Sequence, residues 1–231
     1  RACVAQSLTL RPYNGQVLFA AGRDALADRD FETALDFWKR SFHRNVSVQR
    51  RITQLVAQFV TKDVAQFIQE SFDPDVEALK RVASVLEEYQ LRGDEEQILQ
   101  ILSERLVARA RQKDNRNRVD DWLAAASTYS RLMQPANVAS CLESAMDAAP
   151  SNFVVRLEYA VWKLQTENQP QEALEHLEWC RRLRPKSEKV LRLLEEAKRG
   201  AYSDVRIRPV NATSKTGSRS EEATAPFLLL Q

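Results

Sequence analysis

Apolar residues recur every three or four positions along most of the chain, which is the spacing of side chains on one face of an α-helix. Two such runs have apolar or aromatic residues at Ile52, Leu55, Val56 and Phe59, and at Val82, Val85, Leu86 and Tyr89. Runs of this kind cover the chain up to about residue 199. We therefore predict an all-α chain of amphipathic helices joined by short connections.

Two pairs of prolines show that the helices repeat. Pro135 and Pro150 bracket a stretch of the same length as Pro170 and Pro185, and the second pair begins 35 residues after the first. Proline suits the first turn of a helix and a position just past its end. Apolar or small residues match between the two stretches: Val138, Leu142 and Ala145 in one, and Ala173, Leu177 and Cys180 in the other. Each pair thus predicts the second helix of a two-helix unit.

The same reading extends over the rest of the chain. It predicts one helical repeat domain over 1–199, with units at about 15–46, 47–74, 75–118, 119–152 and 153–187 and a closing helix over 188–199. The first residues resemble the second half of a further unit, so we expect more chain before Arg1. Residues 200–231 are predicted as a disordered tail, because they are rich in Ser, Thr and mixed charge. The apolar segment from Pro226 to Gln231 is either a domain boundary or a short docking peptide.

Several turns can be placed within these units. Gly22 is expected where the two helices of the first unit approach closely, with Arg29 and Asp30 in the turn between them. Gly93 is expected to end a helix, and Asp94 to begin the next one as part of a capping box.

Composition narrows the function. The chain has 5 glycines in 231 residues and a formal net charge of +2, which leaves little room for glycine-rich phosphate loops and shows no general basic excess for nucleic acid. Cys3, Cys141 and Cys180 are far apart, and His43 and His176 are the two histidines. This set predicts structural thiols, no metal site and no cofactor. No apolar run approaches the ~20 residues of a membrane span.

No catalytic motif is found, and we expect no enzyme. Asp120 and Asp121 are adjacent, so on a helix they point to different sides and cannot flank a substrate. A basic cluster covers Arg105, Arg109, Arg111, Lys113, Arg116 and Arg118. It lacks interleaved aromatic residues for base stacking, so we interpret it as a solvated face and loop and keep RNA binding as a lesser alternative.

The repeats resemble those of tetratricopeptide-repeat (TPR) proteins, whose unit is a helix hairpin of ~34 residues. The matching residues are Gly22, Phe31, Ala34 and Trp38 in one unit, Trp122, Tyr129, Ala145 and Pro150 in another, and Leu157, Leu164, Ala173 and Pro185 in a third. The chain departs from the pattern at Val46, where a proline is expected, in the short second unit, and in the insertion near 111–118. The resemblance implies a right-handed α-solenoid with a concave face that binds a protein or peptide, and Trp38 and Trp122 in its core.

Trp38, together with the segment from Phe72 to Asp75, also resembles the TPR regions attached to bacterial O-antigen-ligase-like membrane proteins. This second resemblance implies an alternative function, a soluble regulatory or spacer region of a membrane-bound envelope-polysaccharide protein. The partner would then be a membrane-embedded upstream domain, and the segment would be cytoplasmic or would face the periplasm.

In the TPR family the first helix of each unit lines the concave groove. Carrying that register onto this chain predicts partner-binding positions at Phe19, Arg23, Glu87, Ser127, Arg131, Glu158 and Trp162. For each of them an ordinary solvated or packing role is the alternative. Trp162 is the best candidate, because an aromatic side chain can anchor a peptide. The Lys/Asn pattern by which some TPR proteins bind a terminal carboxylate is not found at these positions.

Overall fold

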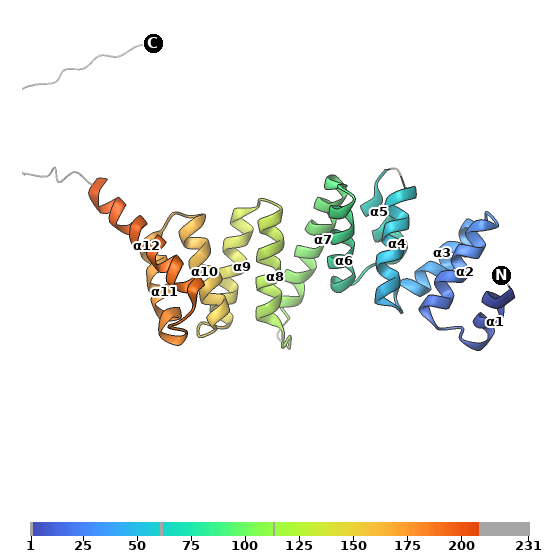
Figure 1. Cartoon of the computed structure of the whole chain (residues 1–231), viewed down its shortest axis with the longest axis horizontal. Helices are drawn as coiled ribbons and strands as arrows, with labels where there is room; N and C mark the ends of the chain where they lie inside the picture. The colour runs from blue at the N-terminus through green and yellow to red at the C-terminus, as the bar shows by residue number, and fades with distance from the viewer. Residues whose placement is uncertain (1, 61, 113, 208–231) are drawn as a thin grey trace, which may run out of the picture.

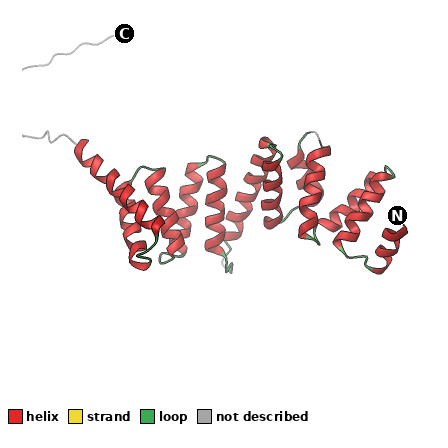
Figure 2. Cartoon of the chain, viewed as in Figure 1, coloured by secondary structure: helices red, strands yellow, loops and turns green. Residues whose placement is uncertain are grey.

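The computed structural model describes residues 2–60, 62–112 and 114–207, and within these ranges the chain forms twelve α-helices and no strand. Their bounds are α1 Ala2–Leu10, α2 Gly15–Ala27, α3 Phe31–Phe42, α4 Val46–Phe59, α5 Val64–Phe72, α6 Val76–Glu88, α7 Arg92–Ala110, α8 Arg118–Arg131, α9 Pro135–Ala148, α10 Phe153–Gln165, α11 Pro170–Leu183 and α12 Glu188–Ile207. The helices stand side by side in one elongated row that runs from α1 to α12 (Figure 1). Short loops join them (Figure 2). The predicted all-α solenoid is confirmed.

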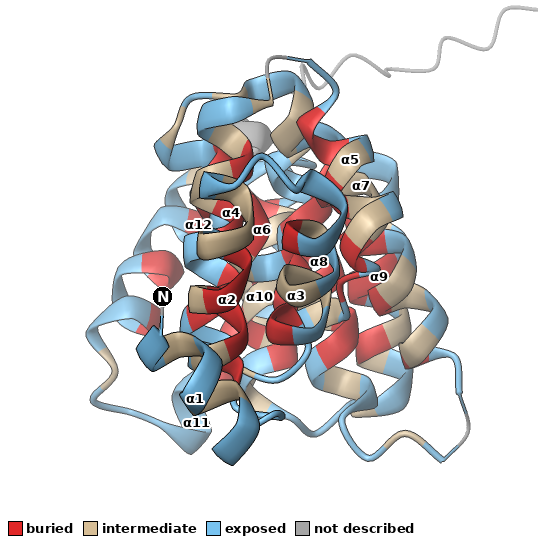
Figure 3. Cartoon of the chain, turned by 90° about the vertical axis from the view of Figure 1, so that its right-hand side faces the viewer, coloured by how far each residue is buried: buried red, intermediate tan, exposed pale blue. Residues whose placement is uncertain are grey.

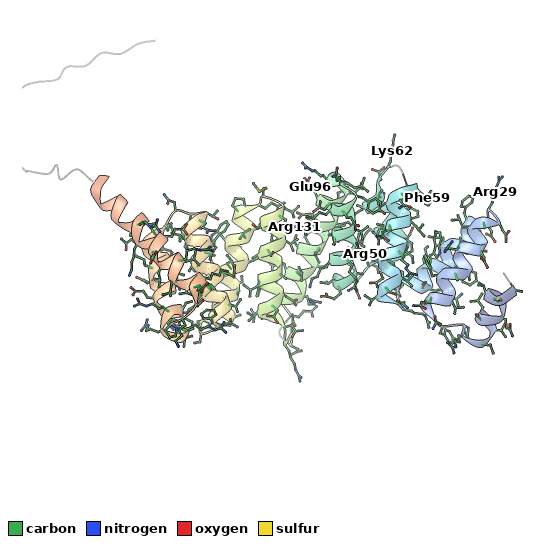
Figure 4. All side chains as sticks on the ribbon, viewed as in Figure 1. Arg29, Arg50, Phe59, Lys62, Glu96 and Arg131 are labelled. Atoms are coloured by element: carbon green, nitrogen blue, oxygen red, sulfur yellow. The ribbon has the colours of Figure 1, made fainter. Side chains whose placement is uncertain are left out.

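Helices α2 to α11 follow one another as antiparallel hairpins. The turns within the pairs α2–α3, α4–α5, α6–α7, α8–α9 and α10–α11 lie along one edge of the row, the upper edge in Figure 1. Arg29 and Lys62, from two of these turns, mark that edge in Figure 4. The division into five repeat units stays a prediction, and each of its ranges holds one of these pairs to within one residue.

Prolines begin and follow the second helices as the sequence predicts. Pro135 is the first residue of α9 and Pro170 the first of α11, while Pro150 and Pro185 lie just beyond the ends of those helices. The matched apolar positions are all buried, namely Val138, Leu142, Ala145, Ala173, Leu177 and Cys180. The repeat therefore reflects equivalent packing positions in successive hairpins.

Each hairpin turn contains a residue other than glycine with a positive φ. These residues are Arg29 (64°), Asp63 (54°), Gln90 (58°), Met133 (56°) and Asn168 (52°). The left-handed conformation ends a helix by turning the chain back on itself, and glycine usually fills it at no steric cost. The chain forms these turns without glycine, so the Cβ atom of each of these residues strains the backbone at its turn.

The first hairpin is closely packed around Gly22. A Cβ atom on Gly22 would lie 2.4 Å from Nε1 of Trp38, so only glycine fits. That indole N–H donates a 3.3 Å hydrogen bond to the carbonyl oxygen of Phe19, and the two aromatic rings stack with centroids 6.4 Å apart. The predicted close approach is confirmed. Trp38 is half-buried against the core, while Trp122 is buried.

The buried residues line the inward faces of the helices (Figure 3). They form two hydrophobic clusters along the row. The first runs from Phe19 in α2 to Val155 in α10, and the second from Leu157 in α10 to Ala197 in α12. The division between the two clusters falls within α10.

Two glycines differ from the roles expected for them. Gly93 lies in the first turn of α7, and the preceding helix α6 already ends at Glu88. Asp94 accepts a hydrogen bond from α5 and does not cap α7, which has no side-chain cap. Gly200 does not mark the start of the tail, because α12 continues to Ile207. A Cβ on Gly200 would lie 3.1 Å from Cβ of Pro170, so this glycine serves close helix packing.

The rest of the predicted tail, residues 208–231, lies outside the described residues, and so does Lys113. Among the residues that the structure describes, no helix is long and apolar enough to cross a membrane, and no group of three or more His, Cys, Asp or Glu side chains is arranged to hold a metal ion.

Candidate functional site

Four of the seven predicted contact residues line one groove. Ser127, Arg131, Glu158 and Trp162 all border a hollow of about 570 Å³ between α8, α9 and α10, which we name the α8–α10 groove. The remaining lining residues are Leu123, Ala126, Ser130, Val138, Leu142, Val154, Val161, Gln165 and Thr166. Most of these are aliphatic, and the polar residues come mainly from the C-terminal half of α8 and from α10. The groove thus combines an apolar surface with hydrogen-bonding groups beside it.

The α8–α10 groove lies where the two hydrophobic clusters meet. Leu142 belongs to the first cluster, Trp162 packs against that cluster, and Val161 packs against the second. Val154, at the start of α10, is 48% exposed. Apolar surface that neither cluster covers is therefore available at this junction.

Trp162 is held in place by polar partners at the end of α10. Its indole N–H donates a 3.1 Å hydrogen bond to Oε1 of Glu167, and Nζ of Lys163 lies 2.6 Å from the other carboxylate oxygen of Glu167. The hydrogen bond from Lys163 holds the pKa of Glu167 below its usual value, and the same contact raises the pKa of Lys163. Glu167 is therefore ionised at neutral pH and orients the indole ring.

Arg131 connects the groove to the preceding hairpin. Its guanidinium lies 3.1 Å from a carboxylate oxygen of Glu87 in α6 and also pairs with Glu95 in α7. Glu87, another predicted contact residue, is thus joined to the groove through Arg131, which Figure 4 labels. The pairs link α6, α7 and α8, but each exposed pair contributes only ~0–1 kcal/mol to stability.

Phe19 and Arg23 lie apart from these residues, in a shallow groove of about 380 Å³ between α2 and α4. Phe19 is only 9% exposed and packs in the first hydrophobic cluster, so it offers little contact area. The other lining residues are Arg51, Gln54, Leu55 and Gln58, all from α4. Sequence reasoning missed the polar residues of α4, although applying the first-helix register to the second unit would have found them.

The basic cluster is used partly for internal contacts. Arg109 forms a two-point ion pair with Asp121, whose side chain is 4% exposed, and Asn115 donates a 2.7 Å hydrogen bond to the same carboxylate. Burial raises the pKa of Asp121, but these hydrogen bonds outweigh it and hold the pKa below the usual value. Nη1 of Arg105 donates a 2.5 Å hydrogen bond to the carbonyl oxygen of Pro74. Both arginines therefore stabilise connections between helices.

Comparisons with known proteins do not assign the chain to a family. No protein-family model matches the chain, and no curated protein matches it. The resemblance to O-antigen-ligase-like proteins is thus unsupported and stays a prediction. Similar solved structures include a chain of the APC/C hetero-tetramer Cut9–Hcn1, 15% identical with a TM-score of 0.44, and yeast Tom70, 16% identical with a TM-score of 0.44. Acl4, an assembly chaperone of RpL4, is 14% identical with a TM-score of 0.33.

These likenesses cover most of this chain but differ in how much of the other chain they cover. The match to Cut9–Hcn1 covers 84% of this chain and 38% of that one, and the match to Tom70 covers 90% and 44%. The match to Acl4 covers 84% of this chain and 85% of that one. The chain thus spans less than half the length of the first two.

Proposed function

We propose that the chain is a protein–protein interaction scaffold that binds a partner, or another part of its own parent protein, through the concave face formed by the first helices of its hairpins. The observation that carries the proposal is the α8–α10 groove, which brings together Ser127, Arg131, Glu158 and Trp162 from two first helices. A row of stacked hairpins offers such an elongated surface and no closed pocket.

The chemistry of the groove suits an apolar side chain of a protein or peptide ligand. Trp162 is half-buried with a fixed indole N–H, so little conformational entropy is lost when a ligand packs on it. Tryptophan and arginine are among the residues that are enriched as anchors in such interfaces. The polar residues Ser127, Ser130 and Gln165 can add hydrogen bonds to the backbone of a bound segment.

The shallow groove between α2 and α4 would give a second contact region on the same face. Arg23 and Arg51 line it together with the amides of Gln54 and Gln58. Its guanidinium groups favour acidic or carbonyl-rich segments. We propose that it extends the contact made in the α8–α10 groove, and that shape and scattered polar contacts, without a cofactor, provide the binding energy.

A charge placed in the apolar part of the groove tests the proposal. Val154 lines the groove and is 48% exposed, whereas Val46 is also exposed, at 59%, and does not line it. Both valines lie in the first turn of a helix with an asparagine N-cap, Val154 as the second residue of α10 and Val46 as the first residue of α4. Because an acidic residue in the first turn of a helix is favourable by ~0.3–1 kcal/mol, Val154→Asp and Val46→Asp should both fold.

Peptides selected from a random display library on the immobilised wild-type chain provide the ligands. We expect Val154→Asp to weaken their binding by about tenfold or more, since burying an unpaired carboxylate is costly. Val46→Asp should bind like the wild type. Equal affinities for the wild type and Val154→Asp, with unchanged helix content, would show that the groove is not the binding surface.

A further inference from the structure

The chain itself contains an apolar segment of the kind that the α8–α10 groove would bind. Residues 226–231 read Pro-Phe-Leu-Leu-Leu-Gln, with four large apolar residues in succession. Residues 208–225 before them are mostly small, polar or charged, and Val210 is their only large aliphatic residue. Apolar surface in such a segment is removed from water only when it finds a partner surface.

We propose that residues 226–231 of the same chain bind in the α8–α10 groove, where Phe227 to Leu230 pack against its apolar lining. The proposal rests on the proposed function, in that it takes this groove as the binding surface, and it names the occupant. The groove is the match for this segment because it exposes aliphatic surface at the junction of the two hydrophobic clusters. By contrast, the groove between α2 and α4 is lined mainly by arginine and glutamine.

The length of the chain allows this contact. Helix α12 has 20 residues and packs against α10 and α11. A helix of that length is about 30 Å long, and each step to a neighbouring helix adds about 8–10 Å. The path from Ile207 runs back along α12 and then takes two such steps, to α10 and across α10 to the groove. Its length is therefore about 50 Å at most. Residues 208–225 can span about 60 Å when extended, at ~3.3 Å per residue.

A tethered segment also needs little intrinsic affinity. Two groups joined within one chain by a short linker meet at effective concentrations of about a millimolar, so a weak contact is sufficient to populate the bound form. The groove volume of about 570 Å³ lies within the ~300–1,000 Å³ that ligand sites commonly enclose, so the groove has room for a few side chains. The segment would thus occupy the groove until a partner with higher affinity displaces it.

Disulfide trapping in the full 231-residue chain tests the contact directly. Exposed Ser127 lines the groove, and exposed Ser140 in α9 does not. Each is changed to cysteine together with Gln231→Cys, in a Cys3→Ser background that removes the exposed native thiol. The other two cysteines, Cys141 and Cys180, are buried and can stay.

We expect the Ser127→Cys pair to form an intramolecular disulfide about tenfold faster than the Ser140→Cys pair, because docking raises the local concentration of the tail thiol. Adding Phe227→Ser and Leu229→Ser should reduce the faster rate to that of the control. Equal rates for the two pairs would overturn the proposal. Disulfides that join two chains, at a rate that rises with protein concentration, would overturn it in favour of a second copy as the occupant.

These outcomes are separate from a failure of the proposed function. If trapping shows no preference for Ser127 while Val154→Asp still weakens the binding of selected peptides, self-docking is wrong and the groove remains a binding surface. If Val154→Asp has no effect on peptide binding but trapping succeeds, the groove serves only the chain's own segment.

Discussion

The carboxylate of Asp94 accepts a 2.9 Å hydrogen bond from the backbone N–H of Ala65, so the first turn of α7 caps the N-terminus of α5 in the preceding hairpin. Helix α5 needs this partner because Asp63, at its own N-cap position, has a left-handed backbone and makes no side-chain cap. Loss of an N-cap acceptor costs about 1 kcal/mol. The contact is therefore a link between two hairpins as well as a cap.

Replacing Asp94 by alanine should lower the free energy of unfolding by about 1 kcal/mol, as measured by urea denaturation. Glu96→Ala is the matched control, because Glu96 lies two residues further along the same turn of α7, is exposed and caps no helix (Figure 4). An equal loss of stability in both variants would mean that the Asp94 contact contributes nothing specific.

The hairpin turns predict a stabilising substitution. Met133 has φ of 56° and is 85% exposed, so its side chain contributes little packing while its Cβ strains the left-handed turn. Met133→Gly should raise the free energy of unfolding by about 0.5–1 kcal/mol, the strain relieved less the larger entropy of the unfolded chain. Ser140→Gly, at an exposed position within α9, should lower it by a similar amount. A destabilised Met133→Gly chain would contradict the prediction.

His176 predicts a pH dependence of stability. Burial, and then the charge of Arg156, lower the pKa of His176 below its ordinary value of 6.5, although Glu175 and Glu172 oppose the shift. Between the lowered pKa and the ordinary one, the unfolded chain binds more protons than the folded chain. The free energy of unfolding should therefore fall as the pH drops below about 6.5 and be unaffected by this group above it.

His176→Gln should flatten this part of the pH profile, as followed by urea denaturation between about pH 7.5 and pH 5.5. A wild-type profile indistinguishable from that of His176→Gln would rule out the role of this histidine.

The three cysteines should differ in reactivity. Burial raises the pKa of the Cys141 thiol to about 11 and also raises that of Cys180, whereas Cys3 is exposed in α1. Only the thiolate reacts, so at about pH 8 a thiol reagent should modify Cys3 well before the other two. In concentrated urea all three should react at similar rates. Modification of Cys141 as fast as Cys3 in the folded chain would show that α9 is not packed as described.

The sequence predicted those parts of the fold that depend on local patterns. The apolar period located the helices, and Pro135 and Pro170 marked the first residues of α9 and α11. Gly22 was placed correctly because the first unit matches the repeat pattern well. The expected limits failed at Gly93, which lies within α7 with open space beside its Cα, and at Gly200, which allows close helix packing. In sequence, both look like glycines that break a helix.

The candidate site was predictable only in part. The first-helix register found four residues of the α8–α10 groove, but not that this groove lies between two hydrophobic clusters. The ion pair between Arg131 and Glu87 and the cap from Asp94 to α5 join residues that are far apart in sequence. Such contacts depend on how one hairpin stacks on the next, which no local pattern encodes.

The most direct test of the binding groove follows the indole N–H of Trp162 by NMR, in a chain whose four tryptophans are labelled with ¹⁵N. The signal of Trp162 is assigned by its loss in Trp162→Phe, and a peptide selected on the wild-type chain is then titrated. We expect this signal to shift in a saturable way, because the indole lies in the groove, while the signals of Trp38 and Trp179, which do not line it, stay in place. Saturable shifts at Trp38 or Trp179 with an unchanged Trp162 signal would contradict this expectation.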